Sequence, residues 1–298
     1  MKQLFIVAIA VFFAACNQHI APTTTPIQNS EIINQNKQTI LLGHCSLSSM
    51  QQNTYKEWYD KSFNAYTVDS SVLPQLKTLL TNKKIEIFLG SWCGDSKREV
   101  PRMMKLLQAA SFDTSNIQLI FVNNDDKQYK QSPQHEERKK FIHHVPTFIV
   151  YENDKEINRI VEAPIESLEK DLLAILSKNK YVSKYQALLQ WQQLKKKNTK
   201  LDDVTLTMLA EKYKPICKHA GEFNALGYVL MAEKKYKQAI NVFKLNTLIY
   251  PDKENVFDSL GEAYFIIGNK TLARANFEKV LTINPKNENA KNMLEKLK

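Results

Sequence analysis

The alternation of apolar and polar positions divides the chain into a first half with short strands and a second half of helices. Short apolar, β-branched runs bounded by polar turns predict strands up to about residue 161, and a helical pattern follows. We therefore expect a mixed α/β domain over residues 38–178 and an all-α domain over residues 179–298. The expected strands are 85–89 and 117–122 as a parallel pair, 147–151 and 156–161 as an antiparallel pair, and an added edge strand at 38–42.

Helices are expected between these strands. Apolar positions from Val100 to Leu107 predict a helix over 97–107, shortly after the strand at 85–89. A segment at 55–63 carries aromatic residues that we expect to pack near the face that carries the candidate active site, at the turn after the strand 85–89. The other expected helices are 73–81, 134–142 and 165–176.

The second half repeats itself at a spacing of 34 residues, which is the period of the tetratricopeptide repeat. Small residues recur where paired helices would approach closely, and aromatic residues recur where they would fill the space between helices. The pattern resembles that repeat and implies units at about 220–253 and 254–287, after an irregular helical pair at 181–214 and before a capping helix at 287–297. The matched positions are Leu226-Gly227 with Leu260-Gly261, Ala239 with Ala273, Phe243 with Phe277, and Pro251 with Pro285.

Candidate chemistry gathers at the turn after the strand 85–89. Gly90 breaks the strand, and Cys93 then lies at the start of the next helix, facing free backbone N–H groups and the positive end of the helix dipole. Such a position favours the thiolate, which is the nucleophilic form of a cysteine. The Ser96 hydroxyl is expected to donate a hydrogen bond to that thiolate, and we expect this to be the larger stabilising contribution.

Residues 92–96, together with the segment 145–151, resemble the thioredoxin superfamily, whose active site is a Trp-Cys-x-x-Cys turn opposed by a cis-proline loop. Pro146 occupies the loop position. Glu99 and Pro101 resemble the run that follows the turn in the periplasmic TlpA/ResA branch of that superfamily.

The resemblance covers roughly residues 73–177 and implies a thioredoxin-like fold, a mixed central sheet flanked by helices. It implies that Cys93 is the nucleophile and that Trp92 shields it with an apolar ring. It also implies that Pro146 marks the backbone edge on which a substrate strand docks.

The sequence departs from the family at the second cysteine, because Ser96 stands in its place. Ile87 likewise stands where thioredoxins have a buried aspartate. A mixed disulfide formed at Cys93 must therefore be released by an external thiol or by another cysteine. The charged residues expected to modulate the thiol are Asp95, a like charge that opposes the thiolate, and Lys97 and Glu99.

The amino terminus has one lysine and then an uncharged apolar run that ends at Ala15-Cys16. The run is shorter than the roughly 20 residues that span a bilayer, and residues 1–16 resemble a bacterial lipoprotein signal, in which Cys16 receives the lipid. An ordinary signal peptide is the alternative. Residues 17–37 are rich in Asn, Gln, Thr and Pro and predict a disordered tether. This organisation implies a lipid-anchored protein of the bacterial cell envelope that faces the periplasm.

Lipid attachment at Cys16 leaves three cysteines in an oxidising compartment. One interpretation pairs Cys45 with Cys217 as a structural disulfide and leaves Cys93 free. Another makes Cys45 or Cys217 a distant thiol that resolves mixed disulfides at Cys93.

The formal charge of +10 raises the question of a nucleic-acid partner. Lysines alternate with acidic residues along most expected helices, and the run Lys195 to Lys197 has no nearby aromatics for stacking bases. We therefore expect no nucleic acid, and only a basic surface with some attraction to anionic lipid. His135, His143 and His144 lack a metal-ligand spacing, and no phosphate-binding loop is present, so neither a metal nor a cofactor is expected.

Two functions are compatible with these patterns. The leading hypothesis is thiol–disulfide exchange of the monothiol or isomerase type through Cys93, with client proteins held by the helical repeats and by the Pro146 loop, and with an external thiol as reductant. The alternative is a non-catalytic adaptor or holdase that joins a redox-weak thioredoxin-like domain to tetratricopeptide repeats.

Overall fold

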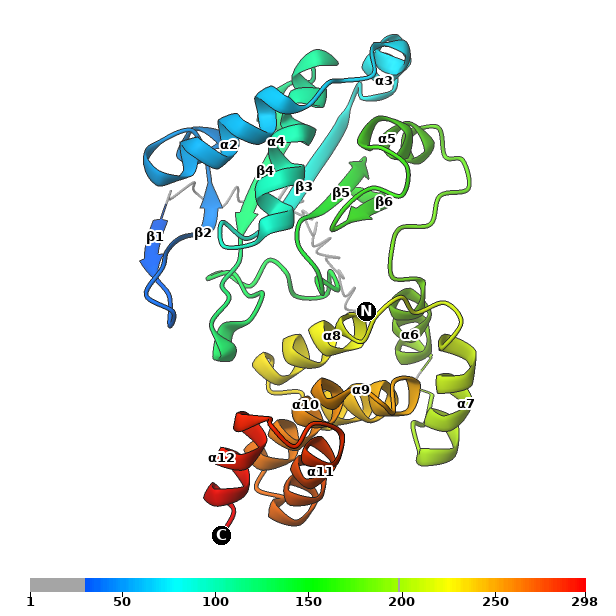
Figure 1. The fold of residues 1–298 in the computed structure, drawn as a ribbon. Coiled ribbons are helices and arrows are strands. Elements are labelled where there is room, and N and C mark those ends of the chain that lie inside the picture. The colour runs from blue at the N-terminus through cyan, green and yellow to red at the C-terminus, as the bar shows by residue number, and fades with distance from the viewer. Residues whose placement is uncertain (1–29, 198) are drawn as a thin grey trace, which may run out of the picture.

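The computed structural model describes residues 30–197 and 199–298, which form an α/β domain followed by a helical domain (Figure 1). The leader, the expected lipid-attachment residue Cys16 and residues 17–29 of the expected tether lie outside the described residues. Within the described part of the chain, no helix has the length and apolarity needed to cross a membrane.

A six-stranded mixed sheet forms the centre of the α/β domain, with the strand order β1-β2-β4-β3-β5-β6. The inner strands β3 and β4 are parallel, and the other neighbouring pairs are antiparallel. The strands expected between residues 85 and 161 are confirmed, with small shifts of their ends. The strands are β1 (Ser30–Ile33), β2 (Thr39–Cys45), β3 (Lys83–Leu89), β4 (Ile117–Phe121), β5 (Thr147–Glu152) and β6 (Lys155–Val161).

Strand β1 corrects the prediction that the whole of 17–37 is a disordered tether. It pairs antiparallel with β2 and forms the edge of the sheet, so the prediction is wrong for residues 30–37, and β2 is an inner strand. The polar residues of the connecting turn are also fixed, because Asn34 Nδ2 donates to Asn124 Oδ1 at 2.9 Å and the Gln35 N–H donates to the Asp125 carboxylate at 2.7 Å. Composition alone does not reveal backbone pairing with a distant strand.

Helices cover one face of the sheet and enclose the main core (Figure 1). Alternate strand residues such as Ile85 and Ile87 share this core with Val100 and Met103 of α4. Tyr59 of α2 is buried in the same core, whereas Trp92 and Cys93 pack against a separate cluster, so packing of the aromatic segment near the cysteine turn stays a prediction. The helices are α1 (Leu47–Met50), α2 (Asn53–Ala65), α3 (Leu73–Leu79), α4 (Gly94–Ala109) and α5 (Leu168–Leu176), with short 3-10 turns η1 (Ser70–Val72) and η2 (Thr114–Asn116).

The helical domain begins at Gln186 and consists of helices alone. Its paired helices approach closely at glycines, since a Cβ atom on Gly227 would lie 2.2 Å from Phe243 Cε1 and one on Gly261 would lie 2.9 Å from Phe277 Cε1. This contact confirms the expected role of the small residues and of the aromatic residues between helices. The helices are α6 (Gln186–Lys196), α7 (Asp203–Tyr213), α8 (Gly221–Ala232), α9 (Tyr236–Ile249), α10 (Glu254–Ile266), α11 (Lys270–Ile283) and α12 (Glu288–Lys296), in agreement with the predicted pair, repeats and cap.

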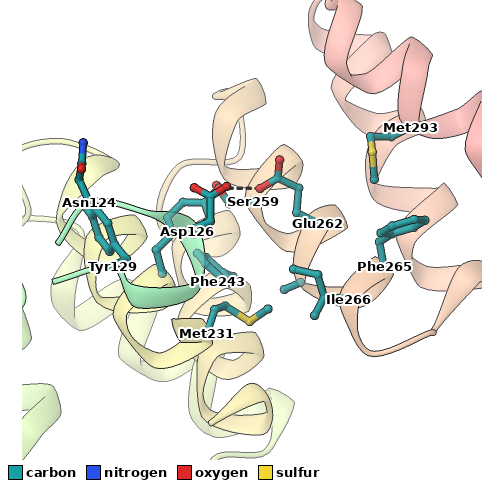
Figure 2. Close-up of a pocket in the computed structure, with 12 residues that line it drawn as sticks. Asn124, Asp126, Tyr129, Met231, Phe243, Ser259, Glu262, Phe265, Ile266 and Met293 are labelled. Atoms are coloured by element: carbon teal, nitrogen blue, oxygen red, sulfur yellow. Dashed lines mark hydrogen bonds between the residues drawn. The ribbon is translucent and has the colours of Figure 1, made fainter. Parts of the chain in front are cut away.

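A groove of about 540 Å³ lies where the two domains meet (Figure 2). One side is formed by residues of the α/β domain around the 3-10 turn η3 (Asp126–Gln128), and the other side by residues of α8, α9, α10 and α12. We call it the interdomain groove.

The second face of the sheet is covered by residues 122–146, here named the covering segment, whose Ile142 and Val145 share a small core with Phe88 of β3. Within this segment the expected helix at 134–142 is wrong, since these residues form only turns. His135, Lys139 and Phe141 have positive φ angles, which interrupt any right-handed helix.

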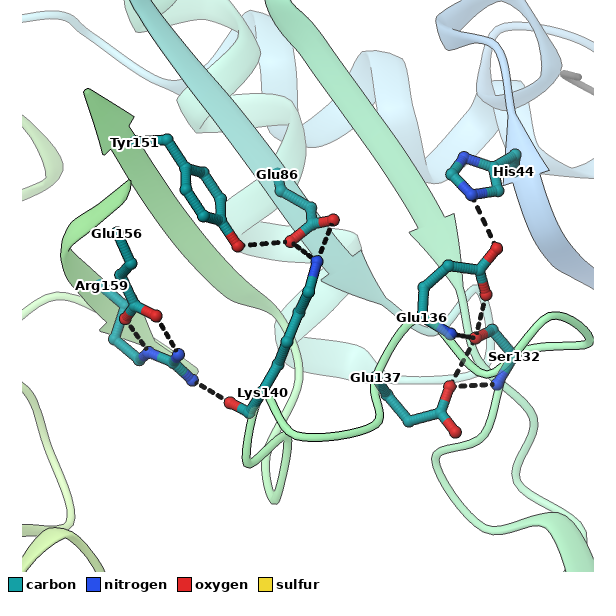
Figure 3. Close-up of polar contacts among 9 residues, drawn as sticks. All are labelled: His44, Glu86, Ser132, Glu136, Glu137, Lys140, Tyr151, Glu156 and Arg159. Atoms are coloured by element: carbon teal, nitrogen blue, oxygen red, sulfur yellow. Dashed lines mark hydrogen bonds and ion pairs between the residues drawn. The ribbon is translucent and has the colours of Figure 1, made fainter. Parts of the chain in front are cut away.

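Polar contacts join the covering segment to the sheet (Figure 3). Lys140 Nζ donates to both carboxylate oxygens of the buried Glu86 at 2.5 Å, and the Tyr151 hydroxyl donates to the same carboxylate at 2.9 Å. Near the other end of the sheet, His44 Nε2 lies 2.7 Å from Glu136 Oε1. These side-chain contacts hold the covering segment against the sheet, although its residues 134–142 do not form a helix.

Candidate functional site

Cys93 occupies the N-cap position of α4, directly after the turn that follows β3. Its N–H donates to the Gly90 carbonyl at 2.9 Å, and its own carbonyl accepts the first helical hydrogen bond from the Lys97 N–H at 3.0 Å. The side chain is half-buried, and the thiol donates to the Val145 carbonyl at 3.2 Å. The sulfur therefore lies between a helix N-terminus and the loop that contains Pro146.

The Val145–Pro146 peptide bond is cis, as the sequence predicts. The loop is fixed on its other side by the Glu162 N–H, which donates to the Pro146 carbonyl at 2.6 Å. Thr147 adds a second contact, from its hydroxyl to the His144 carbonyl at 2.7 Å. The loop thus holds the Val145 carbonyl in place opposite the thiol.

Trp92 lies beside Cys93 and contacts the covering segment. Its indole N–H donates to the Val122 carbonyl at 2.9 Å, and its ring lies 6.5 Å from the Tyr129 ring, measured between centroids. A Cβ atom at Gly90 would lie 2.5 Å from the indole, so the turn requires glycine there. The tryptophan is therefore placed as the expected apolar neighbour of the thiol.

Ser96 does not act on the thiol in the way the sequence led us to expect. The side chain is buried, and its oxygen accepts a hydrogen bond from the Gly90 N–H at 3.2 Å. We find no hydrogen bond between Ser96 and Cys93 within residues 30–298 as described. The hydroxyl stabilises the turn, because the Gly90 N–H would otherwise be a buried donor without a partner.

The expected electrostatic modulators form a local ion-pair network. Arg98 contacts the carboxylates of Asp95 and the buried Glu99 at 2.6 Å each, and these contacts raise the pKa of the arginine, with Glu99 as the main cause. The negative charge of Asp95 is therefore balanced by Arg98. Lys97, the residue before Arg98, is half-exposed.

Lys130 is a site residue that the sequence pattern did not indicate. It belongs to the covering segment, it is 4 % exposed, and its ammonium donates at 2.8 Å to the His143 carbonyl and to the Tyr129 hydroxyl. Burial lowers the pKa of Lys130 to about 7, while the negative charges of Cys93 and Glu162 oppose that shift. The sulfur is thus within electrostatic reach of a buried lysine that changes charge near neutral pH.

His143 and His144 precede the cis-proline loop and are both buried. Their Nδ1 atoms are 2.7 Å apart, so one ring donates to the other. Burial, together with the positive charges of Lys130 and Arg159, lowers the pKa of His143 to about 3. Burial also lowers the pKa of His144. These rings are therefore neutral packing groups beside the thiol.

Tyr185, the residue before α6, packs beside the loop on which a substrate strand was expected to dock. The Tyr185 ring stacks on His144 at 4.0 Å between centroids, and the Tyr185 hydroxyl donates to Glu162. His219 packs edge-on against Tyr185. Pro146 itself is buried, and the docking role expected for its backbone edge stays a prediction.

The three described cysteines are all free. Cys45 is buried in the core of the sheet, and Cys217 packs in the core of the helical domain, so the structural pairing of the two is not formed. Burial raises the pKa of Cys45 to about 11 and that of Cys217 to about 12. Both thiols therefore stay protonated at neutral pH, which also disfavours a role as resolving thiol.

Comparison with known proteins bears on the helical domain. The tetratricopeptide repeat family matches residues 255–287, which contain α11 and all of α10 except its first residue. No curated protein matches the chain significantly. Repeats of this kind generally mediate contacts between proteins, so the helical domain includes a unit of a protein-binding class.

Proposed function

We propose that the α/β domain is thioredoxin-like and that Cys93 carries out thiol–disulfide exchange of the monothiol type on client proteins held by the helical domain. The observation that carries the proposal is the position of the thiol, at a helix N-terminus and 3.2 Å from the carbonyl that precedes a cis-proline. Lipid attachment at Cys16 and a periplasmic location belong to the same proposal, and their support is the sequence pattern of residues 1–16.

The reaction consists of two exchange steps. The Cys93 thiolate attacks one sulfur of a client disulfide, a new S–S bond forms to Cys93, and the other client sulfur leaves as a thiolate and takes up a proton. An external thiol, as its thiolate, then attacks the mixed disulfide at the client sulfur and frees Cys93. Ser96 cannot perform this second step, because it carries no thiol.

Trapping of mixed disulfides tests the proposal. The full-length protein, mixed with oxidised clients and quenched with acid, should give covalent adducts that a reductant removes. Cys93→Ala should abolish these adducts, whereas Cys217→Ala should retain them and serves as the matched control. Adducts of equal abundance in the wild type and in Cys93→Ala would exclude exchange at this residue.

A second function has a specific observation in its favour. Pro146 is buried and Tyr185 stacks on the nearby His144, and a thioredoxin-like domain whose cis-proline loop is packed in this way fits an adaptor or holdase. This alternative predicts that Cys93→Ala protects a client from aggregation as well as the wild type does, and light scattering of a heated client measures that protection.

A further inference from the structure

The interdomain groove combines an apolar wall with an acidic side (Figure 2). Met231 from α8, Phe265 and Ile266 from α10, and Met293 from α12 supply the apolar wall. Ile266 is 59 % exposed, so part of this apolar surface has no partner in the described chain.

Carboxylates form the acidic side of the groove. Glu262 of α10 and Asp126 of η3 line it, and Asp258 lies one helical turn before Glu262. Their hydrogen bonds come from uncharged groups, namely Tyr228 to Glu262 at 2.8 Å, Asn289 to Asp258 at 3.0 Å and Gln35 to Asp126 at 3.0 Å.

In a chain of net charge +10, it is notable that no ion pair joins these three carboxylates to a lysine or arginine of the described residues. Burial raises the pKa of Glu262, and Asp258 and Asp126 add to that shift through their negative charges. A partly buried carboxylate without a cation is an unfavourable arrangement, and a ligand that brings a positive charge would relieve it.

We propose that the interdomain groove binds a client segment in which a lysine or arginine is flanked by apolar residues, with the cation at Glu262 and Asp126 and its neighbours on the methionine and phenylalanine side chains. This inference rests on the proposed function, since the occupant is the client of Cys93. Charge complementarity selects a basic segment over an acidic one.

The groove is connected to the thiol by a short row of aromatic rings. Tyr129 lies 6.5 Å from Trp92, the neighbour of Cys93, and 6.4 Å from Tyr228, which donates to Glu262. An extended peptide advances about 3.3 Å per residue, so about four residues at most cover the path along these rings from Trp92 to Tyr228. One short client segment can therefore reach both the groove and the neighbour of the thiol.

Binding of matched peptides to the full-length protein in detergent tests the inference. The peptides are labelled twelve-residue segments that differ only at one position, which is lysine, norleucine or glutamate, four residues from a serine that replaces the cysteine. Fluorescence anisotropy should give about tenfold tighter binding for the lysine peptide than for the glutamate peptide.

Variants locate the effect. Glu262→Gln should weaken binding of the lysine peptide about fivefold or more, whereas Glu278→Gln, an exposed acid on α11, should leave it unchanged. Glu262→Lys should reverse the preference toward the glutamate peptide. Thermal unfolding of each variant distinguishes a loss of contact from a loss of fold.

Equal affinity for the lysine and glutamate peptides, or equal effects of Glu262→Gln and Glu278→Gln, would overturn the inference. Peptide binding, compared with adduct formation by the wild-type protein, separates the two proposals. If the lysine preference persists while the wild type forms no client adduct at Cys93, exchange fails and the groove assignment holds. If adducts form without any charge preference, the groove assignment fails and exchange holds.

Discussion

At the residue scale, the environment of Cys93 differs from the one expected from its immediate sequence. Neighbours within the turn, Ser96 and Asp95, are engaged with Gly90 and Arg98. A charged group from outside the turn, Lys130 of the covering segment, is distant in sequence and buried, and its pKa responds to the negative charge of Cys93. A lysine in a polar stretch gives no sign of burial, so no local pattern could have identified it.

Replacing Lys130 with methionine should slow alkylation of Cys93 by iodoacetamide at pH 7 severalfold, because the thiolate loses a nearby positive charge. The pKa of Lys130 is lowered by burial to about 7, whereas it is near 10.4 in an unfolded chain. From pH 7 to pH 9 the unfolded chain therefore binds more protons, and this residue makes the free energy of unfolding rise by up to about 1.4 kcal/mol per pH unit.

Lys130→Met should remove that rise in urea titrations across the same pH range. Lys97→Met, which removes a half-exposed cation from the same end of α4, is the control and should change the alkylation rate little, because solvent screens its charge. An unchanged rate and an unchanged slope in Lys130→Met would contradict the role assigned to this lysine.

At the element scale, the two repeats share a sequence pattern but differ in the tightness of their helix contacts. The approach of α8 to α9 at Gly227 is closer than that of α10 to α11 at Gly261, judged by the distance from a Cβ atom to the facing phenylalanine. Phe243 and Phe277 are both fully buried, so neither ring can move aside into solvent.

Gly227→Ala should therefore lower the free energy of unfolding by about 2–3 kcal/mol, and Gly261→Ala by about 1 kcal/mol. Urea titrations followed by circular dichroism measure both, and each variant serves as the control for the other because both gain the same methyl group in the same repeat position. An equal cost for the two would show that the difference in helix approach has no energetic consequence.

At the scale of the whole molecule, the segment that leads into the helical domain packs against the α/β domain close to the cis-proline loop. Tyr185 connects the two, through its stack on His144 and its hydrogen bond to Glu162. Under the proposed function, a client that reaches the Val145–Pro146 loop has to displace this contact.

Tyr185→Ala should raise the rate at which Cys93 reacts with a bulky polyethylene glycol maleimide severalfold, while the rate with the small reagent iodoacetamide changes less. The reason is that the stack of Tyr185 on His144 limits the space for a bulky reagent beside the loop. A small reagent already reaches Cys93, because this residue is partly exposed. Tyr236→Ala, at a partly exposed position on α9, is the matched control. A similar increase for both reagents would indicate general loosening of the fold.

Much of the architecture was predictable from the sequence, because it depends on local patterns. Apolar periodicity predicts the buried strands from β3 to β6, the turn that carries Cys93 and the helical repeats. Single residues add to it, such as Gly227, which is small enough for close helix packing, and Pro146, which forms the cis peptide bond. These features determined the fold class and one candidate nucleophile.

The tertiary structure alone decided the rest. Contacts between segments far apart in the chain decide four features: the pairing of β1, the irregular path of residues 134–142, the burial of Lys130 and the stack of Tyr185 on His144. The sequence around polar residues such as Glu86 and Lys140 looks the same whether their side chains are solvated or paired with each other in the interior. Only the folded structure shows that these two are paired.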